Sequence, residues 1–224
     1  LQGASKKTGQ AIVQHPDLSA VAFTGSLMGG RAIMDAAAAR KKPIPVFAEM
    51  GSLNPVFLLP EALKKRSKDI ATGFLNSLTM GVGQFCTNPG VLLALDSPEL
   101  DDFLKHLSDG IGRIQPRTML HSGIFQNYNS ILKIFCQTQG VRIHTRSGIT
   151  SNPARIEADT LVLETDYTTW CMREELRQEC FGPASIVVRI KNLEELLSFA
   201  RNMEGSLTAT IHGTHDDLEK YKSL

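Results

Sequence analysis

The chain has 224 residues, 42% of them hydrophobic, and its 24 Lys and Arg nearly balance its 23 Asp and Glu. Such a chain can bury a full core, either as one large domain or as one and a half smaller ones. Balanced charge without long runs of one sign argues against nucleic acid or an anionic membrane as a partner. No apolar run approaches the roughly 20 residues of a membrane span, and the opening LQGASKKTGQ lacks the apolar core of a signal peptide.

Helical and strand patterns alternate along the chain. The first half of the chain predicts a helix that begins near 8 and ends near His15-Pro16, a strand at 21–25, a helix at 27–42, apolar β-rich runs at 43–49 and 54–60, a helix at 63–81 and a strand at 91–95. The second half predicts helices at 98–111 and 127–137, strands at 141–146, 160–165 and 185–190, a helix at 192–203 and a strand at 207–213. This alternation is typical of an α/β fold with a mostly parallel sheet flanked by helices. A last helix begins with Asp216 as its cap and stops soon after, so we expect a fragment of a longer protein.

The four cysteines contain no Cys-x-x-Cys pair, which argues against a disulfide framework and favours a reducing, cytoplasmic compartment. We expect Cys136, in an apolar run, to be a core residue. Cys171 and Cys180 flank a charged helix-like stretch, and we expect neither to react. His212 and His215 are separated by a Gly-Thr turn and no zinc-type spacing occurs elsewhere, so the sequence predicts no metal site.

The first segment with chemical potential is Phe23-Thr24-Gly25-Ser26, where a predicted strand meets a predicted helix. Gly25 permits a tight turn, the free amides of a helix N-terminus attract anions, and the Ser26 hydroxyl can add a hydrogen bond. We expect two further glycines, Gly29 and Gly30, to leave room for a phosphate group. The alternative is an ordinary helix that Ser26 caps.

The second segment ends an apolar β-rich run in Glu49, followed by Met50 and Gly51. Burial raises the pKa of a carboxyl group and makes it a useful proton acceptor near neutrality. The alternative is an exposed glutamate at the end of a strand.

The third segment, GQFCTNPG at 83–90, follows a predicted helix and contains Cys86. Its glycines and proline favour an irregular backbone that exposes a thiol, with a backbone amide available to a developing oxyanion. The alternative is a buried structural cysteine. Further along, Glu179 and Phe181 precede a Gly-Pro turn, and together they would hold a flat polar ligand.

In this order, FTGS, a glutamate before Met-Gly, GQ-x-C, E-x-FGP and SLTATIHG resemble the aldehyde dehydrogenase superfamily over essentially the whole chain. FAEMGSLNPVFLLPEAL and GVGQFCTNPG look most like its bacterial NADP-preferring branch, which includes 2,5-dioxopentanoate (α-ketoglutarate semialdehyde) and fatty aldehyde dehydrogenases. The resemblance implies that residues 1–49 are the C-terminal part of a Rossmann-like coenzyme domain. Residues 50–224 would then be a catalytic domain truncated at its C-terminus.

The resemblance also implies a role for each matching residue. Cys86 would be the nucleophile, which forms a thiohemiacetal and then a thioester, and Glu49 the base that activates water. The cofactor, NADP or NAD, would contact Gly25 and Ser26 through its pyrophosphate, Met50 and Gly51 beside the nicotinamide, and Glu179 and Phe181 at the ribose and ring. The substrate would be a small aldehyde, and the full-length protein a cytoplasmic homo-oligomer. We expect little activity from this chain alone, because the family's upstream oxyanion asparagine and ribose-binding lysine have no match here.

Two departures from the family pattern leave the aldehyde open. Met50-Gly51-Ser52-Leu53 stands where Leu-Gly-Gly-Lys is common, and Val91 where many members have arginine. Besides the fatty aldehyde dehydrogenase alternative, Cys86 with a histidine base would make a thiol hydrolase or acyltransferase, although no Cys/His pairing signature is present. A third possibility is a truncated domain that acts only in binding or oligomerisation.

Overall fold

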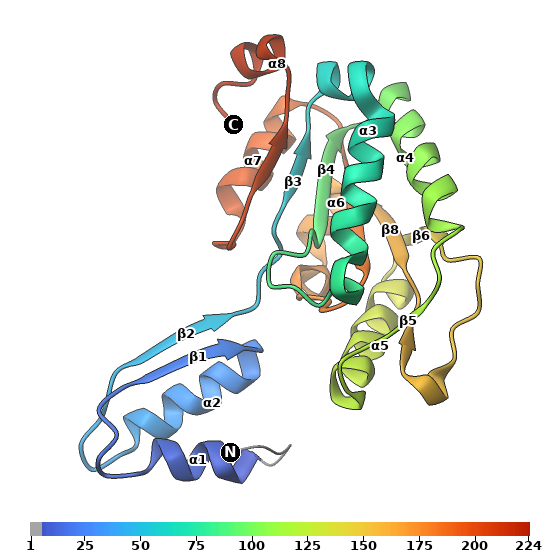
Figure 1. The fold of residues 1–224 in the computed structure, drawn as a ribbon. Coiled ribbons are helices and arrows are strands. Elements are labelled where there is room, and N and C mark those ends of the chain that lie inside the picture. Colours follow the sequence, from blue (N-terminus) through green and yellow to red (C-terminus); the bar gives the residue numbers. More distant parts are fainter. Residues whose placement is uncertain (1–5) are drawn as a thin grey trace. The chain divides into compact units, whose positions relative to one another are not determined.

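The computed structural model describes residues 6–224. The chain divides into two units, Leu1–Gly51 and Ser52–Leu224. Residues 1–5 of the predicted 1–49 domain lie outside the described residues. Figure 1 shows the helices and strands of both units and labels most of them. No helix in the described range is long and apolar enough to cross a membrane.

The Leu1–Gly51 unit contains two parallel strands and two helices. Its elements are α1 (Lys6–Val13), β1 (Val21–Gly25), α2 (Leu27–Ala38) and β2 (Val46–Met50). The strands pair in parallel from Val21 opposite Val46 to Gly25 opposite Met50. Arg40, just beyond α2, donates hydrogen bonds to the carbonyl of Val13, the last residue of α1, at 2.5 Å and to that of Leu18, in the loop after α1, at 3.2 Å. Both helices end a few residues earlier than predicted.

A six-stranded sheet forms the centre of the Ser52–Leu224 unit, in the order β10-β3-β4-β9-β8-β6. These strands are β3 (Val56–Leu58), β4 (Val91–Leu95), β6 (Arg142–Arg146), β8 (Leu161–Asp166), β9 (Ala184–Ile190) and β10 (Thr210–His212). All pairs are parallel except β6 with β8. The predicted α/β class with a mostly parallel sheet is therefore confirmed.

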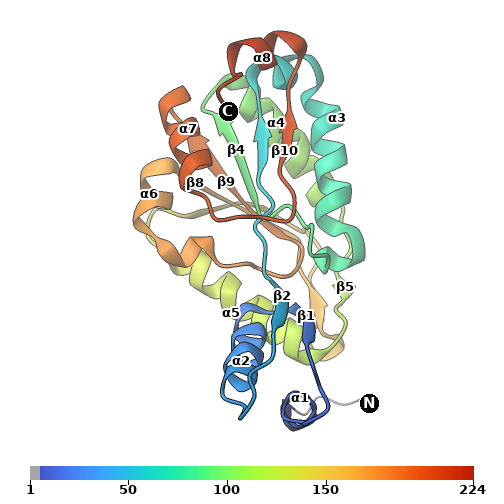
Figure 2. The same ribbon diagram turned by 90° about the vertical axis from the view of Figure 1, so that its left-hand side faces the viewer.

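Helices cover both faces of this sheet. They are α3 (Pro60–Thr79), α4 (Pro98–Ile111), α5 (Ser122–Gln137), α6 (Tyr167–Met172), α7 (Leu193–Asn202) and α8 (His215–Lys220), with 3₁₀ turns η1 (Met80–Gly83), η2 (Pro153–Arg155) and η3 (Glu174–Arg177). A short antiparallel pair, β5 (Arg117–Thr118) with β7 (Glu157–Ala158), lies outside the main sheet. In Figure 2, α3 lies on one side of the sheet and α7 on the other.

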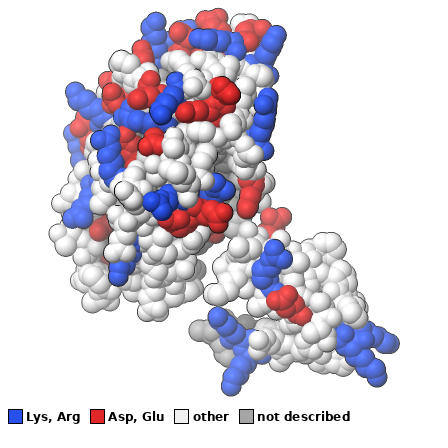
Figure 3. Space-filling model, turned by 180° about the vertical axis from the view of Figure 1, so that it is seen from behind, with Lys and Arg blue, Asp and Glu red and all other residues white. Residues whose placement is uncertain are grey.

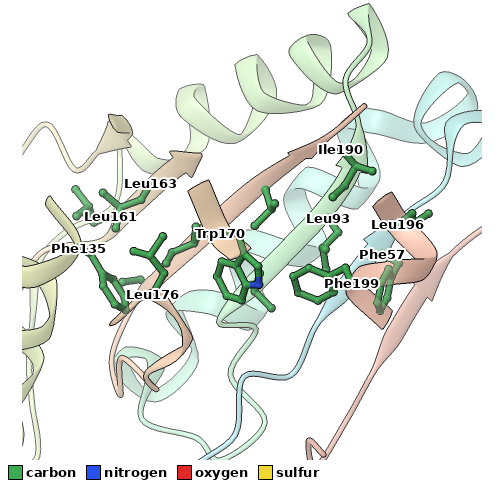
Figure 4. Packing of buried hydrophobic residues seen from close by; sticks show 14 of the residues in the cluster. Phe57, Leu93, Phe135, Leu161, Leu163, Trp170, Leu176, Ile190, Leu196 and Phe199 are labelled. Carbon is green, nitrogen blue, oxygen red and sulfur yellow. The ribbon is translucent and has the colours of Figure 1, made fainter. Parts of the chain in front are cut away.

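The residues of β4 alternate between two hydrophobic cores, as expected for a strand buried on both faces. Leu92 and Ala94 pack in the cluster that includes residues of α3 and α4, whereas Val91 and Leu93 pack in the cluster that includes residues of α5, α6 and α7. In the second cluster the Phe199 ring lies 5.4 Å from Trp170 and 6.3 Å from Phe57, centroid to centroid (Figure 4). Apolar burial on both faces of β4 holds the start of this strand, which follows the Cys86 segment, in place.

Two predictions about single residues are wrong. The N-cap of α8 is Thr214, not Asp216, because Thr214 forms a reciprocal capping box with Asp217. Cys136 is exposed instead of lying in the core. Tyr128 and Phe135 are the buried residues of α5, and one residue further along the helix turns the Cys136 side chain away from that face.

Charged side chains of both signs intermingle on the face of the Ser52–Leu224 unit that Figure 3 shows. The best-connected charges centre on Glu164, whose side chain is only 3% exposed. It accepts hydrogen bonds from Arg142, Arg189 and His144. Arg189 also pairs with Asp96, so this network joins the C-terminal ends of β4, β8 and β9 to the edge strand β6.

Candidate active site

The FTGS segment forms the turn between β1 and α2 as predicted from the sequence. Ser26 is the N-cap of α2, and its hydroxyl accepts a hydrogen bond from Gly29 N at 3.2 Å. Gly25 and Ser26 are exposed. Gly30 is buried, and a Cβ there would lie 2.1 Å from Met50 Sδ. Gly30 therefore makes room for Met50, and not for a phosphate as expected.

Glu49, Met50 and Gly51 end the first unit. Glu49 lies on β2 opposite Thr24, and its side chain is exposed in the described chain. Met50 is half-buried against α2, and Gly51 turns the chain with φ of +67°. This exposure corresponds to the alternative interpretation of Glu49 as a glutamate at the end of a strand.

Cys86 lies in an irregular loop of the second unit, between η1 and β4. Gly81, Val82 and Gly83 have φ of +55°, +61° and +65°, which bends the chain sharply after α3. Asn88 N donates to Phe85 O at 3.0 Å and closes a turn around Cys86. The Cys86 residue is exposed, so the alternative of a buried structural cysteine does not hold.

The backbone amides at the tip of this turn are available to a ligand. Within the described chain, no hydrogen bond uses the N–H of Cys86 or of Thr87. The carbonyl of Cys86, in contrast, accepts a hydrogen bond from Asn54 Nδ2 at 2.8 Å. An exposed thiol beside free N–H groups is an arrangement that suits a nucleophile whose product carries negative charge on oxygen.

Glu179 and Phe181 lie next to the base of the same loop. Glu179 Oε1 accepts a hydrogen bond from Ser52 N at 3.3 Å. Burial raises the pKa of Glu179, and this hydrogen bond offsets part of that rise. The next residue after Phe181, Gly182, accepts a hydrogen bond through its carbonyl from Asn88 Nδ2 at 3.0 Å.

A small cavity lies between these segments, and its lining includes Ser52, Phe85, Asn88, Glu179, Phe181 and Ser185. Two buried polar atoms of this lining, Asn88 Oδ1 and Ser185 Oγ, have no hydrogen-bond partner in the described chain. The structure thus brings the predicted residues Glu179 and Phe181 to the loop that carries Cys86.

The remaining cysteines differ in their surroundings. Burial raises the pKa of the Cys180 thiol far above its usual value, and the neighbouring Glu179 raises it further. Burial also raises the pKa of Cys136, although that residue is partly accessible. Cys171 is exposed. A raised pKa lowers the thiolate fraction, so Cys136 and Cys180 are poor nucleophiles at neutral pH.

Sequence reasoning missed Asn54 and Asn88, which hold the Cys86 loop. Both belong to Asn-Pro pairs, and an asparagine before proline is a turn signal. The signal was therefore present, but it does not reveal which carbonyls each amide would meet. No group of three or more His, Cys, Asp or Glu in the described range is arranged to hold a metal ion.

The profile described as "Aldehyde dehydrogenase family" matches residues 1–121. Over 97% of its length the chain is 41% identical to alpha-ketoglutaric semialdehyde dehydrogenase 2 of Azospirillum brasilense and 36% identical to alpha-ketoglutaric semialdehyde dehydrogenase of Acinetobacter baylyi. It spans only 41% of each of these relatives.

Solved structures share the fold at lower identity. A mutant of Proline Utilization A from Bradyrhizobium japonicum superposes with a TM-score of 0.79 at 20% identity, over 99% of this chain and 23% of that one. A putative aldehyde dehydrogenase from Burkholderia cenocepacia gives 0.77 at 17% identity, over 96% of this chain and 46% of that one. The profile match over more than half of the residues, together with these relatives, establishes that the chain belongs to the aldehyde dehydrogenase family.

Proposed function

We propose that the protein containing this chain oxidises an aldehyde to a carboxylate with NAD(P)⁺, using Cys86 as the nucleophile. The observation that carries the proposal is the exposed Cys86 in a turn whose carbonyl is anchored and whose N–H is unused. We take α-ketoglutarate semialdehyde as the substrate, because two relatives named for that reaction align with 97% of the chain.

The reaction follows from the residues in this order. The thiolate of Cys86 adds to the aldehyde carbon, and the Cys86 N–H stabilises the alkoxide that forms. A bound NAD(P)⁺ would supply the acceptor for the hydride that leaves this carbon, and a thioester would then remain on Cys86. Glu49 then accepts a proton from water, whose oxygen attacks the thioester carbonyl. The C–S bond breaks, sulfur leaves as the thiolate, and the carboxylic acid that forms loses its remaining proton to solvent and departs as the carboxylate.

Each unit, taken by itself, has groups that suit part of a dinucleotide. At the start of α2, Ser26 Oγ already accepts a hydrogen bond from Gly29 N. The N–H groups of Leu27 and Met28 belong to the first turn, where a helix offers no acceptor of its own, and both residues are exposed. Those amides suit a pyrophosphate group. In the other unit, Glu179 can accept from ribose hydroxyls, and Phe181 offers an apolar surface for the nicotinamide. We also assign Gly25, Met50 and Gly51, at the ends of β1 and β2, to cofactor binding. We favour NADP over NAD.

The domain assignment is part of the proposal. Residues 1–49 would be the end of the coenzyme domain and residues 50–224 most of the catalytic domain, which the division after Gly51 supports. We further propose a cytoplasmic homo-oligomer for the full-length protein. The chain alone should have little activity, and NADPH formation by the isolated chain with an aldehyde would contradict this.

A second candidate is a fatty aldehyde dehydrogenase. Three large apolar residues in or next to the Cys86 segment are exposed. Met80, at the start of η1, is 58% exposed, Phe85, within the segment, 49%, and Leu120, which is hydrogen-bonded to Gln84, 79%. Leu120 is held there by a hydrogen bond from its N–H to Gln84 Oε1 at 2.9 Å. Exposed apolar side chains near a thiol favour an apolar substrate, since binding would remove them from water.

The deciding experiment measures NAD⁺ and NADP⁺ reduction by the full-length protein with α-ketoglutarate semialdehyde and with aliphatic aldehydes of increasing length. Cys86→Ala should abolish reduction, whereas Cys171→Ala, which removes another exposed cysteine, should leave it unchanged. Glu49→Gln should keep a first-turnover burst but slow the following turnovers, since thioester hydrolysis needs the base. Full activity in Cys86→Ala would refute the proposal, and higher kcat/KM with long aldehydes would favour the second candidate.

A further inference from the structure

The side-chain amide of Asn54 uses both of its ends inside the Ser52–Leu224 unit. Its Nδ2 donates to the carbonyl of Cys86 at 2.8 Å and to that of Asn88 at 2.9 Å. Its Oδ1 accepts from Ser52 Oγ at 2.7 Å and from Thr208, through N at 3.2 Å and Oγ1 at 3.1 Å. Asn54 is only 2% exposed, so water does not compete for these bonds.

The position demands asparagine for two separate reasons. Asn54 has φ of +49°, in the left-handed region that asparagine tolerates better than most residues. The two loop carbonyls require a donor, while Ser52 and Thr208 require an acceptor. Aspartate would place a carboxylate against the two carbonyls, and aliphatic residues would leave all of these groups unpaired in a buried place.

These bonds restrict the backbone on the C-terminal side of the thiol. A peptide unit is planar and trans, so its C=O and N–H point in opposite directions. Because Asn54 holds the Cys86 carbonyl toward the interior, the N–H of Thr87 must point away from it. The turn bond from Asn88 N to Phe85 O closes the other side. Cys86 therefore lies between two fixed points of the main chain.

We propose that Asn54 is a positioning residue that sets the direction of the Cys86 thiol and of the amides at the tip of the loop. The inference rests on the proposed role of Cys86 as nucleophile. Asn54 does not touch the substrate and acts through the main chain of Cys86. Through Thr208 it also ties the loop to the segment before β10, so part of the SLTATIHG motif supports the site.

The test compares full-length wild-type protein with Asn54→Asp, which keeps the shape but loses both donors to the loop. The matched control is Asn202→Asp, which removes an exposed amide donor to the Ser198 carbonyl in α7, in an element that takes no part in holding the Cys86 loop. Four quantities are measured: the folded fraction by circular dichroism, the single-turnover rate of hydride transfer, the KM for aldehyde, and the rate of Cys86 alkylation by iodoacetamide. Alkylation requires an accessible thiolate but no oriented carbonyl, so it separates positioning from simple loss of folded protein.

In folded Asn54→Asp, hydride transfer should fall by about 10²-fold, because small displacements of a reacting group cost that much. Alkylation of Cys86 and the KM for aldehyde should change far less, and Asn202→Asp should stay close to wild type. Wild-type hydride transfer in folded Asn54→Asp, or a loss that only follows the folded fraction, would overturn the inference.

Two further results keep the tests separate. If wild-type protein is inactive with every aldehyde, or if Cys86→Ala remains active, the proposed function fails. That failure is independent of any Asn54 variant. If Asn54→Asp does not fold, a crystal structure of the wild-type protein decides. An Asn54 amide donating to the Cys86 carbonyl supports the inference, and an amide turned away from that carbonyl overturns it.

Discussion

Gly83 and Gly182 lie with main chain against main chain. A Cβ built on Gly83 would be 2.3 Å from the carbonyl carbon of Gly182, far inside van der Waals contact. The same Gly182 carbonyl accepts a hydrogen bond from Asn88 Nδ2. The loop before Cys86 and the turn after Phe181 therefore approach each other so closely that a side chain at Gly83 would separate them, whereas a Cβ at Gly182 would instead meet the Tyr128 ring.

We expect Gly83→Ala to lower the free energy of unfolding by about 3 kcal/mol or more, because the left-handed φ and the backbone overlap both oppose a Cβ. Gly73→Ala is the matched control. Gly73 is exposed in the middle of α3 with no atom within 4 Å of a built Cβ, so alanine there should stabilise by up to about 1 kcal/mol. Urea unfolding of both variants checks this, and equal midpoints would contradict the account of Gly83.

Asp217 should matter far more for stability than its neighbour Asp216. The Asp217 carboxylate is 1% exposed and accepts from the N–H groups of Glu61 and Ala62, at the start of α3, and of Thr214. Asp217→Ala leaves three donors unpaired and should cost about 2–4 kcal/mol. Asp216 makes an exposed pair with Lys65 at 3.8 Å, so Asp216→Ala should cost under about 1 kcal/mol. Thermal melts measure both, and the reverse order would refute this assignment.

The sequence predicts individual helices and strands better than the contacts between them. β4 and α4 have the predicted limits, because an apolar run and a Ser-Pro helix start are local signals. The strands β5 and β7 are too short to leave a pattern. Asp216 and Asp217 are equivalent as sequence, and only the α3 amides that lie 155 and 156 residues away distinguish them.

The candidate site shows the same limit. Cys86, Glu179 and Phe181 were predictable because each lies in a recognisable short segment. Asn54 was not, since its role depends on carbonyls 32 and 34 residues away and on Thr208, which is 154 residues away. Hydrogen bonds between distant segments depend on the order of strands in the sheet, and residue patterns do not specify that order.

Glu164 should make the protein sensitive to acid. Burial alone would raise its pKa, but hydrogen bonds from His144, Arg142 and Arg189 outweigh burial and lower the pKa from 4.5 to about 2. A lowered folded-state pKa contributes stability above pH 4.5 that is lost as the pH falls toward 2. The contribution is on the order of 3 kcal/mol for this nearly buried carboxylate.

Glu164→Gln should therefore be less stable than wild type at pH 7, and the two should approach each other in stability between pH 4.5 and pH 2. Glu219→Gln, which changes an exposed glutamate of α8, is the control and should follow the wild-type curve at every pH. Chemical unfolding at a series of pH values measures this. A constant difference between wild type and Glu164→Gln across the acid range would show that the carboxylate does not titrate as described.

Alkylation should separate the four cysteines of the folded chain. The Cys180 thiol should resist iodoacetamide at neutral pH and still at pH 9, since burial raises its pKa and Glu179 adds negative charge beside it. Cys86 and Cys171 are exposed and should react first. If the free amides at the loop tip stabilise negative charge, Cys86 should react faster than Cys171.

Peptide mass spectrometry after timed labelling measures each site, and labelling in guanidinium, where all four should react alike, is the control. Early modification of Cys180 would mean that its surroundings open readily, whereas equal rates for Cys86 and Cys171 would mean that the loop does not activate its thiol.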